Sequence, residues 1–362
     1  MNINVMNIVA DENIPYVKEA FSTLGKVTTV NGREVSSDTL KTTDILLVRS
    51  ITNVKQQLLE NTPVKFVASA TAGFNHIDLD YLKEHNIGFS RAPGSNAISA
   101  AEYVIAGISL WSLKENKDLS TLSIGIIGCG NVGSRVKQLC EDLGITCIIN
   151  DPPLEKSGAT SYHFSSLKEA LACDIVTLHT PLSHDGDYPT FRLINQHAIN
   201  SLKAGTLFIN ASRGEVVEEP SLLKRMNNKN DLTLILDVWE NEPKINLEML
   251  KHTLIGTPHI AGYSIDGKIR GTEMIYKAVC HYLGEQPIWS ASTVDFSDNP
   301  RTTIKLNQST DKRKKILKAY NIKQDDNDLK KQLNDASLQD GQYFDSLRKN
   351  YPARREYSNL IG

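Results

Sequence analysis

Three glycines with the spacing G-x-G-x-x-G follow an apolar run in the middle of the sequence. The run, Ile124–Ile127, is typical of a buried strand, and the residues after the glycines have a helical pattern. In that context Gly128 permits a tight turn, Gly130 lets the main chain approach a pyrophosphate, and Gly133 lets helix and strand pack closely. The segment therefore predicts a dinucleotide site.

The flanking residues indicate which dinucleotide is bound. The amides of Asn131 and Val132 open the helix and would face the pyrophosphate. The next apolar run, Thr146–Asn150, leads into Asp151, 18 residues after Gly133, close to the interval of about 20 at which a carboxylate binds the ribose hydroxyls. Because a carboxylate repels a 2′-phosphate and the two prolines that follow offer no arginine, the sequence predicts NAD rather than NADP.

Three side chains with complementary chemistry stand on loops after later apolar runs: Arg213, Glu242 and His259. Oxidation of an alcohol next to a carboxylate needs a hydride acceptor, a base for the hydroxyl proton, and a cation that holds the carboxylate. His259 is the candidate base, because an imidazole titrates near working pH, and Glu242 would fix its tautomer. Arg213 would bind the carboxylate as a fork and polarise the developing carbonyl.

Further cofactor contacts are predicted at or just after the ends of apolar runs. These positions are Thr180, Ala211, Ser212, Asp237 and Gly262, in addition to Arg213. Thr180 would lie near the adenosine, residues 211–213 near the nicotinamide ribose, and Asp237 at the nicotinamide end. For Asp237, a helix cap at the end of a strand is the alternative.

The elements that must position these residues form two successive series. Apolar runs alternate with helical stretches through the first 95 residues and again from Ser123 to Pro258, which is the pattern of parallel α/β sheets. A buried helix is expected from Ala97 to about Leu113, and the helix Ser264–Gly284 is expected to pack back on the first series. The predicted domains are a substrate domain of residues 1–95 and 260–286, a cofactor domain of residues 96–259, and a C-terminal domain of residues 287–362.

Composition excludes several classes of protein. The net charge is −2, which does not suggest a nucleic-acid or membrane binder. The total combines an acidic body with a basic tail, since residues 301–362 contain 14 Lys and Arg against 8 Asp and Glu. No apolar run is long enough to span a bilayer and no basic leader is evident, so a cytoplasmic protein is expected. The five cysteines form no C-x-x-C pair, so no metal site is predicted and reduced thiols are expected.

These motifs resemble those of the NAD-dependent, D-isomer-specific 2-hydroxyacid dehydrogenases. The narrower resemblance is to members that oxidise 4-phospho-D-erythronate in vitamin B6 biosynthesis. It is carried by the segments Ala10–Tyr16, Val48–Ser50, Thr71–Gly73 with His76, Asp151–Pro153, His179–Gly186, His259–Tyr263, Leu347–Tyr351 and Arg354–Glu356. It covers nearly the whole chain, tail included.

The resemblance implies a fold and a set of site residues. The expected fold is a flavodoxin-like substrate domain with an inserted Rossmann NAD domain, both doubly wound parallel sheets, and a small α+β C-terminal domain that forms a homodimer. The family's catalytic set falls on Arg213, Glu242 and His259. Its substrate-binding hydroxyl positions fall on Ser50, Thr71 and Tyr263, and the expected partner is a small phosphorylated 2-hydroxy acid.

Several alternatives remain open at this stage. The substrate could be that of another D-2-hydroxyacid dehydrogenase, such as 3-phosphoglycerate, and the chain could be a non-catalytic, NAD-responsive binding protein on the same fold. Arg49 either contacts the substrate or points away from it. The basic tail either reaches the substrate phosphate, with Arg354 or Arg355 as the hypothesis and Arg348 and Lys349 as further candidates, or is a solvated face of a small oligomerisation domain.

Overall fold

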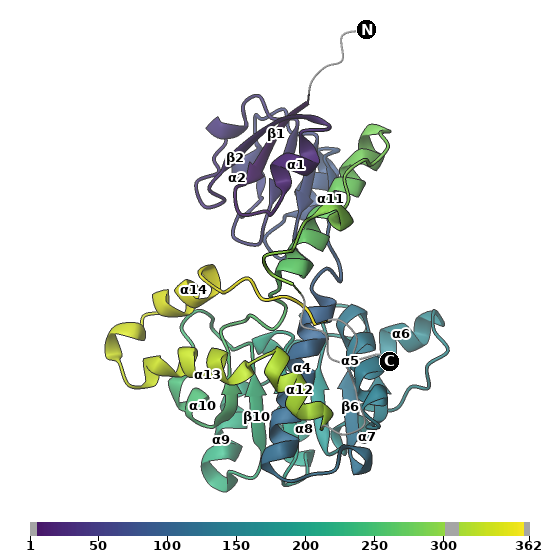
Figure 1. The fold of residues 1–362 in the computed structure, drawn as a ribbon, viewed down its shortest axis with the longest axis vertical. Helices are drawn as coiled ribbons and strands as arrows, with labels where there is room; N and C mark the ends of the chain where they lie inside the picture. Colours follow the sequence, from purple (N-terminus) through teal and green to yellow (C-terminus); the bar gives the residue numbers. More distant parts are fainter. Residues whose placement is uncertain (1–5, 301–310, 358–362) are drawn as a thin grey trace. The chain divides into compact units, whose positions relative to one another are not determined.

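The structure is a computed structural model that describes residues 6–300 and 311–357, and it divides into two compact units (Figure 1). Unit 1 comprises Met1–Asn96 and Ser264–Pro300, and unit 2 comprises Ala97–Tyr263 and Arg301–Gly362. The chain therefore leaves unit 1 after Asn96, at the predicted break, returns to it at Ser264, and leaves it again after Pro300. A separate C-terminal dimerisation domain stays a prediction, since this division groups the tail with unit 2.

Unit 1 is built on a five-stranded parallel sheet. Its strands are β1 (Met6–Asp11), β2 (Gly25–Val30), β3 (Ile45–Val48), β4 (Phe66–Ser69) and β5 (Gly88–Arg91). Their order is β2-β1-β3-β4-β5, the flavodoxin-like order that was predicted. The short helices between them are α1 (Val17–Phe21), α2 (Gln56–Leu59) and α3 (Leu79–Glu84).

The long helix α11 (Ile265–Leu283) completes unit 1, as predicted. The Ser264 hydroxyl accepts the amide of Gly267 at 2.9 Å and starts the helix, and Gly284, at φ 74°, ends it in the left-handed conformation. The buried face of the helix, including Ile275 and Val279, packs in the same core as β1 and α1.

Unit 2 contains a six-stranded parallel sheet. Its strands are β6 (Ser123–Ile127), β7 (Thr146–Asn150), β8 (Ile175–Leu178), β9 (Leu207–Asn210), β10 (Thr233–Leu236) and β11 (Thr253–Gly256). They lie in the order β11-β10-β9-β8-β6-β7. Beyond β7, Phe164 makes an isolated parallel bridge with Ile149 and takes the place of a further strand. With that bridge counted, the order is the Rossmann order. The strand order reverses between the neighbouring parallel strands β6 and β8, which is the switch point of the sheet.

The helices of unit 2 cover both faces of this sheet (Figure 1). They are α4 (Ala97–Lys114), α5 (Asn131–Asp142), α6 (Pro152–Ser157), α7 (Leu167–Leu171), α8 (Gln196–Ser201), α9 (Glu219–Lys229) and α10 (Leu247–Lys251). Helix α4 is buried along nearly its whole length, as its apolar composition predicts. All five cysteines are unpaired and four of them are buried.

The described part of the tail is helical and packs on unit 2. Its helices are α12 (Lys312–Ala319), α13 (Ile322–Lys330) and α14 (Gln342–Lys349). Ile316 and Tyr320 join the core on the α4 side of the sheet, and Leu329 and Phe344 join the core on the other side. The predicted α+β character is wrong for residues 311–357, which contain no strand, because these short amphipathic helices bury their apolar faces on the existing core.

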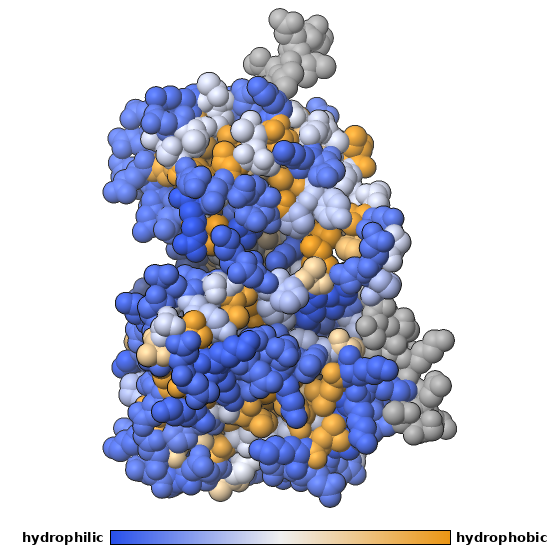
Figure 2. Space-filling view, turned by 60° about the vertical axis from the view of Figure 1, so that its left-hand side comes forward, coloured by the Kyte–Doolittle hydropathy of each residue, from blue (hydrophilic) through white to orange (hydrophobic). Residues whose placement is uncertain are grey.

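The surface visible in Figure 2 is mostly hydrophilic, with apolar side chains gathered in small groups. Among residues 6–300 and 311–357, no helix combines the length and the hydropathy required to cross a bilayer.

Candidate active site

The three glycines of the G-x-G-x-x-G motif have different roles in the structure. Gly128 has φ 86°, and a Cβ there would lie 2.8 Å from the main chain of His179. A Cβ on Gly133 would overlap the carbonyl of Gly128. Gly130, the N-cap of α5, has φ −73° and open space where its Cβ would stand. The fold itself therefore requires the first and third glycines, whereas the second leaves room for a ligand to approach the helix N-terminus.

Asp151 ties the glycine turn to the end of β7. One carboxylate oxygen accepts the amide of Cys129 at 2.7 Å, and the other accepts the amide of Leu154 at 3.0 Å and caps α6. A carboxylate oxygen can accept more than one hydrogen bond, so both retain acceptor capacity for ribose hydroxyls. Asp151 thus stands beside the glycine turn, where the sequence predicts the ribose.

The loop after β8 carries unsatisfied polar atoms. The hydroxyl of Thr180 and the Nδ1 atom of His179 are buried and have no hydrogen-bond partner within the described residues, while His179 Nε2 lies 3.0 Å from the Thr177 hydroxyl. Buried polar atoms are normally paired, so these two fit a polar ligand that binds against the glycine turn. Together with the space at Gly130 and the carboxylate of Asp151, they fit NAD.

Replacing Thr180 with valine is expected to separate cofactor binding from stability. Removal of an unpaired buried hydroxyl leaves the free energy of unfolding equal or higher, whereas loss of a hydrogen bond to NAD weakens NAD binding about 3- to 10-fold. Calorimetric titration and urea unfolding measure the two effects. Thr206→Val is the matched control, because the Thr206 hydroxyl is also buried and unpaired but lies before β9, at the opposite end of the strands. Equal NAD affinities in both variants would contradict the assignment.

Asp237 builds the loop that presents the candidate base. Its buried carboxylate accepts the Thr257 hydroxyl at 2.7 Å and the amides of Ile260 at 2.8 Å and Ala261 at 3.0 Å. Its carbonyl accepts the amide of His259 at 2.7 Å, and His259 adopts φ 56°. Burial raises the pKa of Asp237, against the charge of His259 and these hydrogen bonds. Asp237 thus has a structural role in this loop, although it caps no helix within the described residues, and its contact with NAD stays a prediction.

His259 and Glu242 form the predicted pair. His259 Nδ1 lies 2.8 Å from one Glu242 oxygen, and the other oxygen accepts the amide of Trp239 at 3.0 Å. Burial would raise the pKa of Glu242, but His259, the Trp239 amide and the charge of Arg348 outweigh it and hold that pKa below its ordinary value. An ionised carboxylate only accepts, so Nδ1 carries the hydrogen and Nε2 of the neutral ring is free to act as a base.

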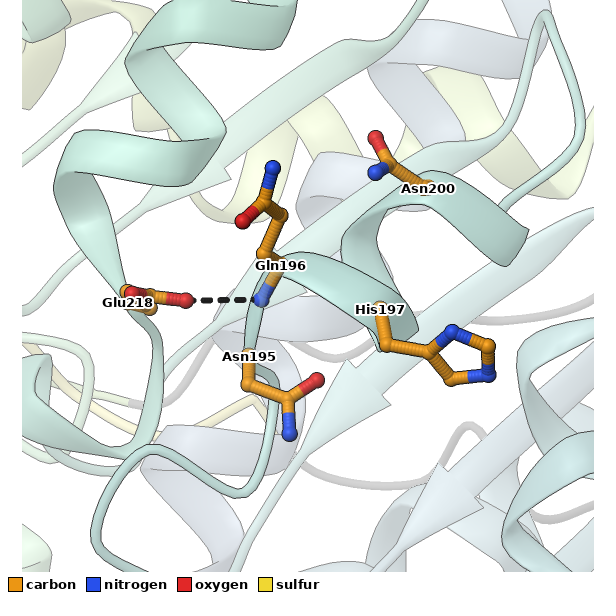
Figure 3. Close-up of a pocket in the computed structure, with 5 residues that line it drawn as sticks. All are labelled: Asn195, Gln196, His197, Asn200 and Glu218. Carbon is orange, nitrogen blue, oxygen red and sulfur yellow. Dashed lines mark hydrogen bonds between the residues drawn. The ribbon is translucent and has the colours of Figure 1, made fainter.

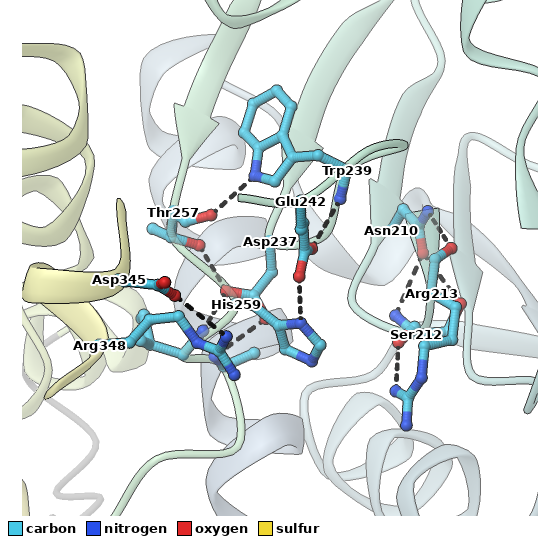
Figure 4. Close-up of polar contacts among 12 residues, drawn as sticks. Asn210, Ser212, Arg213, Asp237, Trp239, Glu242, Thr257, His259, Asp345 and Arg348 are labelled. Atoms are coloured by element: carbon cyan, nitrogen blue, oxygen red, sulfur yellow. Dashed lines mark hydrogen bonds and ion pairs between the residues drawn. The ribbon is translucent and has the colours of Figure 1, made fainter. Parts of the chain in front are cut away.

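The loop after β9 places Arg213 next to this pair. The Asn210 side chain donates to the Arg213 carbonyl at 3.0 Å and accepts from the Ser212 amide at 3.1 Å and hydroxyl at 2.9 Å. Any side chain at Gly214 would overlap the main chain of Trp239, so the two loops pack in direct contact. Figure 4 shows Arg213 and His259 on the same side of the strand ends.

A second carboxylate, that of Glu219, binds the main chain of the Glu242 loop. Glu219 is 9% exposed, and its Oε2 accepts the amide of Glu240 at 3.2 Å. Burial, aided by the charge of Glu240, raises the pKa of Glu219 to about 7, despite the hydrogen bonds it accepts.

Stability is therefore expected to depend on pH through Glu219. A carboxyl whose pKa is about 7 folded and 4.5 unfolded binds more protons in the folded state between these values, so its contribution to the free energy of unfolding falls as pH rises. Glu219→Gln keeps an acceptor without the charge, and is expected to be about 2–3 kcal/mol more stable than the parent above pH 7 and similar to it near pH 4.5. Urea unfolding at the two pH values checks this. An equal difference at both would contradict it.

The predicted substrate residues are divided between the units. Tyr263 lies in unit 2, with its ring edge-on to Tyr351 at 5.8 Å. Thr71 lies in unit 1, where its hydroxyl is 2.8 Å from that of Ser69, which is 3.1 Å from Nε2 of the buried His76. Burial lowers the pKa of His76 to about 4. A common substrate site for the two units stays a prediction.

The other predicted contacts of unit 1 and the tail have mixed outcomes. Ser50 is exposed at a turn after β3. Arg49 pairs with the buried Asp11 at 3.0 Å. Arg354 is not available for a substrate phosphate, because its guanidinium is buried in unit 2 and pairs with Glu102 at 3.1 Å.

A shallow surface depression of about 380 Å³ lies elsewhere in unit 2 (Figure 3). It is lined by Asn195, Gln196, His197, Asn200 and Glu218. The Glu218 carboxylate accepts the Gln196 amide at 2.7 Å. None of the predicted site residues lines it, so it takes no part in the predicted chemistry.

Comparison with known proteins identifies the family. Residues 101–261 match the NAD-binding domain of D-isomer specific 2-hydroxyacid dehydrogenases, and residues 298–361 match a domain of unknown function. Among solved structures, 3-phosphoglycerate dehydrogenase from Entamoeba histolytica with bound NAD has a TM-score of 0.66 at 24% identity, covering 82% of this chain and 99% of that one. D-Lactate dehydrogenase from Aquifex aeolicus with NAD and lactic acid has a TM-score of 0.62 at 24% identity, covering 77% and 95%. At such identities these two structures show the fold alone.

Curated relatives match over almost the full length. Erythronate-4-phosphate dehydrogenase from Marinobacter nauticus is 44% identical over 361 residues, covering 98% of this chain and 94% of the relative. The enzymes of the same name from Hahella chejuensis and Escherichia coli O81 are 42% and 44% identical, each covering 98% of this chain and 93% of the relative. Both the broad and the narrow resemblance are thus confirmed, and the chain belongs to the erythronate-4-phosphate dehydrogenase family of NAD-dependent D-isomer specific 2-hydroxyacid dehydrogenases.

Proposed function

We propose that this chain oxidises 4-phospho-D-erythronate to (R)-3-hydroxy-2-oxo-4-phosphooxybutanoate with NAD, a step of vitamin B6 biosynthesis. The observation that carries the proposal is the His259–Glu242 pair at 2.8 Å, with the loop of Glu242 packed against the loop of Arg213. The substrate follows from the relatives named above, which align along nearly the whole chain.

For each step of the reaction, this site contains a residue that could carry it out. The Arg213 guanidinium would hold the carboxylate next to the reacting carbon and stabilise the developing carbonyl oxygen. Nε2 of His259 would take the hydroxyl proton, and the Glu242 carboxylate would stabilise the imidazolium that results. NAD, when bound, accepts the hydride. Ser50, Thr71 and Tyr263 are proposed to bind substrate oxygens, and Asp237 and Gly262 to line the nicotinamide.

A panel of 2-hydroxy acids tests the function. NADH formation is followed with 4-phospho-D-erythronate, D-erythronate, 3-phosphoglycerate and D-lactate, and again with NADP in place of NAD. The highest kcat/KM is expected for 4-phospho-D-erythronate with NAD. A higher kcat/KM for 3-phosphoglycerate would make that acid the substrate instead. No turnover of any acid would favour a non-catalytic binding protein.

We also propose a cytoplasmic homodimer. The matched C-terminal domain, residues 298–361, is the candidate dimer contact. Light scattering of the full chain measures the oligomeric state, and a monomer at micromolar concentration would contradict the proposal.

A further inference from the structure

Arg348, on helix α14 of the tail, lies beside the catalytic pair although almost 90 residues separate it from His259. Figure 4 shows its guanidinium on one side of the His259 ring and Arg213 on the other. Arg348 reaches this place because α14 packs on unit 2 through the buried Phe344. Two arginines therefore flank the candidate base, one from the first segment of unit 2 and one from the tail.

The Arg348 side chain interacts with Asp345 and with the Tyr263 side chain, yet one of its donors has no hydrogen-bond partner within the described residues. It is 27% exposed, and its ion pair with Asp345 is at the 4.0 Å limit. Its Nε atom is buried without a hydrogen-bond partner within the described residues. A partly buried guanidinium with a spare donor is a costly arrangement for the protein alone and is a suitable receptor for an anion.

The electrostatic neighbours of Arg348 belong to the site. Burial would lower its pKa, but the Tyr263 side chain and the charge of Glu242 raise it, so the group stays charged. Tyr263 is one of the predicted substrate residues, and Glu242 holds the candidate base. The Arg348 guanidinium therefore lies next to two residues of the predicted site.

We propose that Arg348 binds the phosphate of the substrate while Arg213 binds its carboxylate. The inference rests on the proposed function and names the residue that selects a phosphorylated acid. In 4-phospho-D-erythronate the carboxylate is attached to the reacting carbon on one side, and the phosphate follows two carbons away on the other. A base between two arginines matches that arrangement of charges, because each anionic end meets its own fork.

The test compares Arg348→Gln with the parent enzyme on two substrates that differ only in the phosphate. The ratio of kcat/KM for 4-phospho-D-erythronate to that for D-erythronate is expected to fall about 30- to 100-fold in the variant, as for loss of a charge-assisted hydrogen bond. Arg348→Lys, which keeps the charge but not the fork, is expected to recover part of the ratio. Lys323→Gln, at an exposed position of helix α13 in the same tail, removes the same charge and is the matched control.

A second measurement separates this inference from the proposed function. Inorganic phosphate is titrated calorimetrically into the NAD-loaded parent and into NAD-loaded Arg348→Gln, and at least tenfold weaker binding is expected in the variant. This readout holds whichever phosphorylated acid the enzyme prefers, whereas the parent's substrate panel alone decides the function.

Two results would overturn the role of Arg348. One is an unchanged substrate ratio with unchanged phosphate binding. The other is an equal loss of kcat on both substrates with the acid limb of the pH profile moved to higher pH, because Arg348 would then act only by lowering the pKa of Glu242.

Discussion

Replacing His259 with asparagine is expected to lower kcat for the oxidation by about 10²- to 10⁴-fold, the contribution of a positioned general base. Asparagine suits this position because, among residues with side chains, it tolerates the left-handed conformation that His259 adopts at φ 56°. The amide of residue 259 still donates to the Asp237 carbonyl, so the loop keeps its anchor. NAD affinity and the free energy of unfolding are therefore expected to change little.

Controls for the His259 variant come from its own unit. His197 is exposed in the shallow depression on α8, and its replacement with asparagine is expected to leave kcat unaffected. Glu242→Gln is expected to lower kcat as well, and the double variant with His259→Asn to be no slower than His259→Asn alone, because Glu242 acts through the imidazole. Retention of most of the turnover in His259→Asn would show that another group takes the proton.

Replacing Arg354 with alanine is expected to lower the free energy of unfolding by about 3–5 kcal/mol, as for a broken buried ion pair. The guanidinium, 9% exposed, donates to Glu102 at 3.1 Å, to the Tyr263 carbonyl at 3.0 Å and to the Ser99 carbonyl at 3.1 Å. It also lies 4.2 Å from the ring centroid of Tyr320. Removal takes this ion pair away from the Glu102 carboxylate, which is 2% exposed.

Urea unfolding measures this effect, with Arg135→Ala as the matched control. Arg135 is exposed on α5 of the same unit, and its loss is expected to change the free energy of unfolding by no more than about 0.5 kcal/mol. Combining Arg354→Ala with Glu102→Gln is expected to recover part of the loss, because the buried charge is then removed. An Arg354→Ala protein of normal stability with a raised KM would contradict this structural role and show that Arg354 binds the substrate.

The tail shows why its basic residues were not distinguishable from the sequence. Arg348 and Arg354 have the same side chain, lie six residues apart and share the same basic segment. Arg354 is buried against Glu102, whereas Arg348 has a buried donor that lacks a hydrogen-bond partner among the residues the structure describes. The sequence predicted an excess of positive charge there, and only the partners brought by α4 and by the catalytic loops distinguish a structural arginine from a candidate ligand.

The sequence by itself determined the two parallel sheets and the residue types of the proposed catalytic set. Periodicity of apolar residues marks β strands and their ends, and the ends of parallel strands in a doubly wound sheet share one edge, so Gly128, Arg213 and His259 were assigned to one site from local patterns. The glycine at 130 was likewise interpretable as a ligand position, because its context is local.

Tertiary structure alone decided the contacts between segments distant in sequence. The Asp237 carboxylate holds the His259 loop, Gly214 brings the Arg213 loop onto Trp239, and α14 places Arg348 beside Glu242. The helical form of the tail was also decided this way, since its short helices gain stability from the core of unit 2 rather than from their own propensity. These features depend on packing between elements, which a single sequence does not encode in any local pattern.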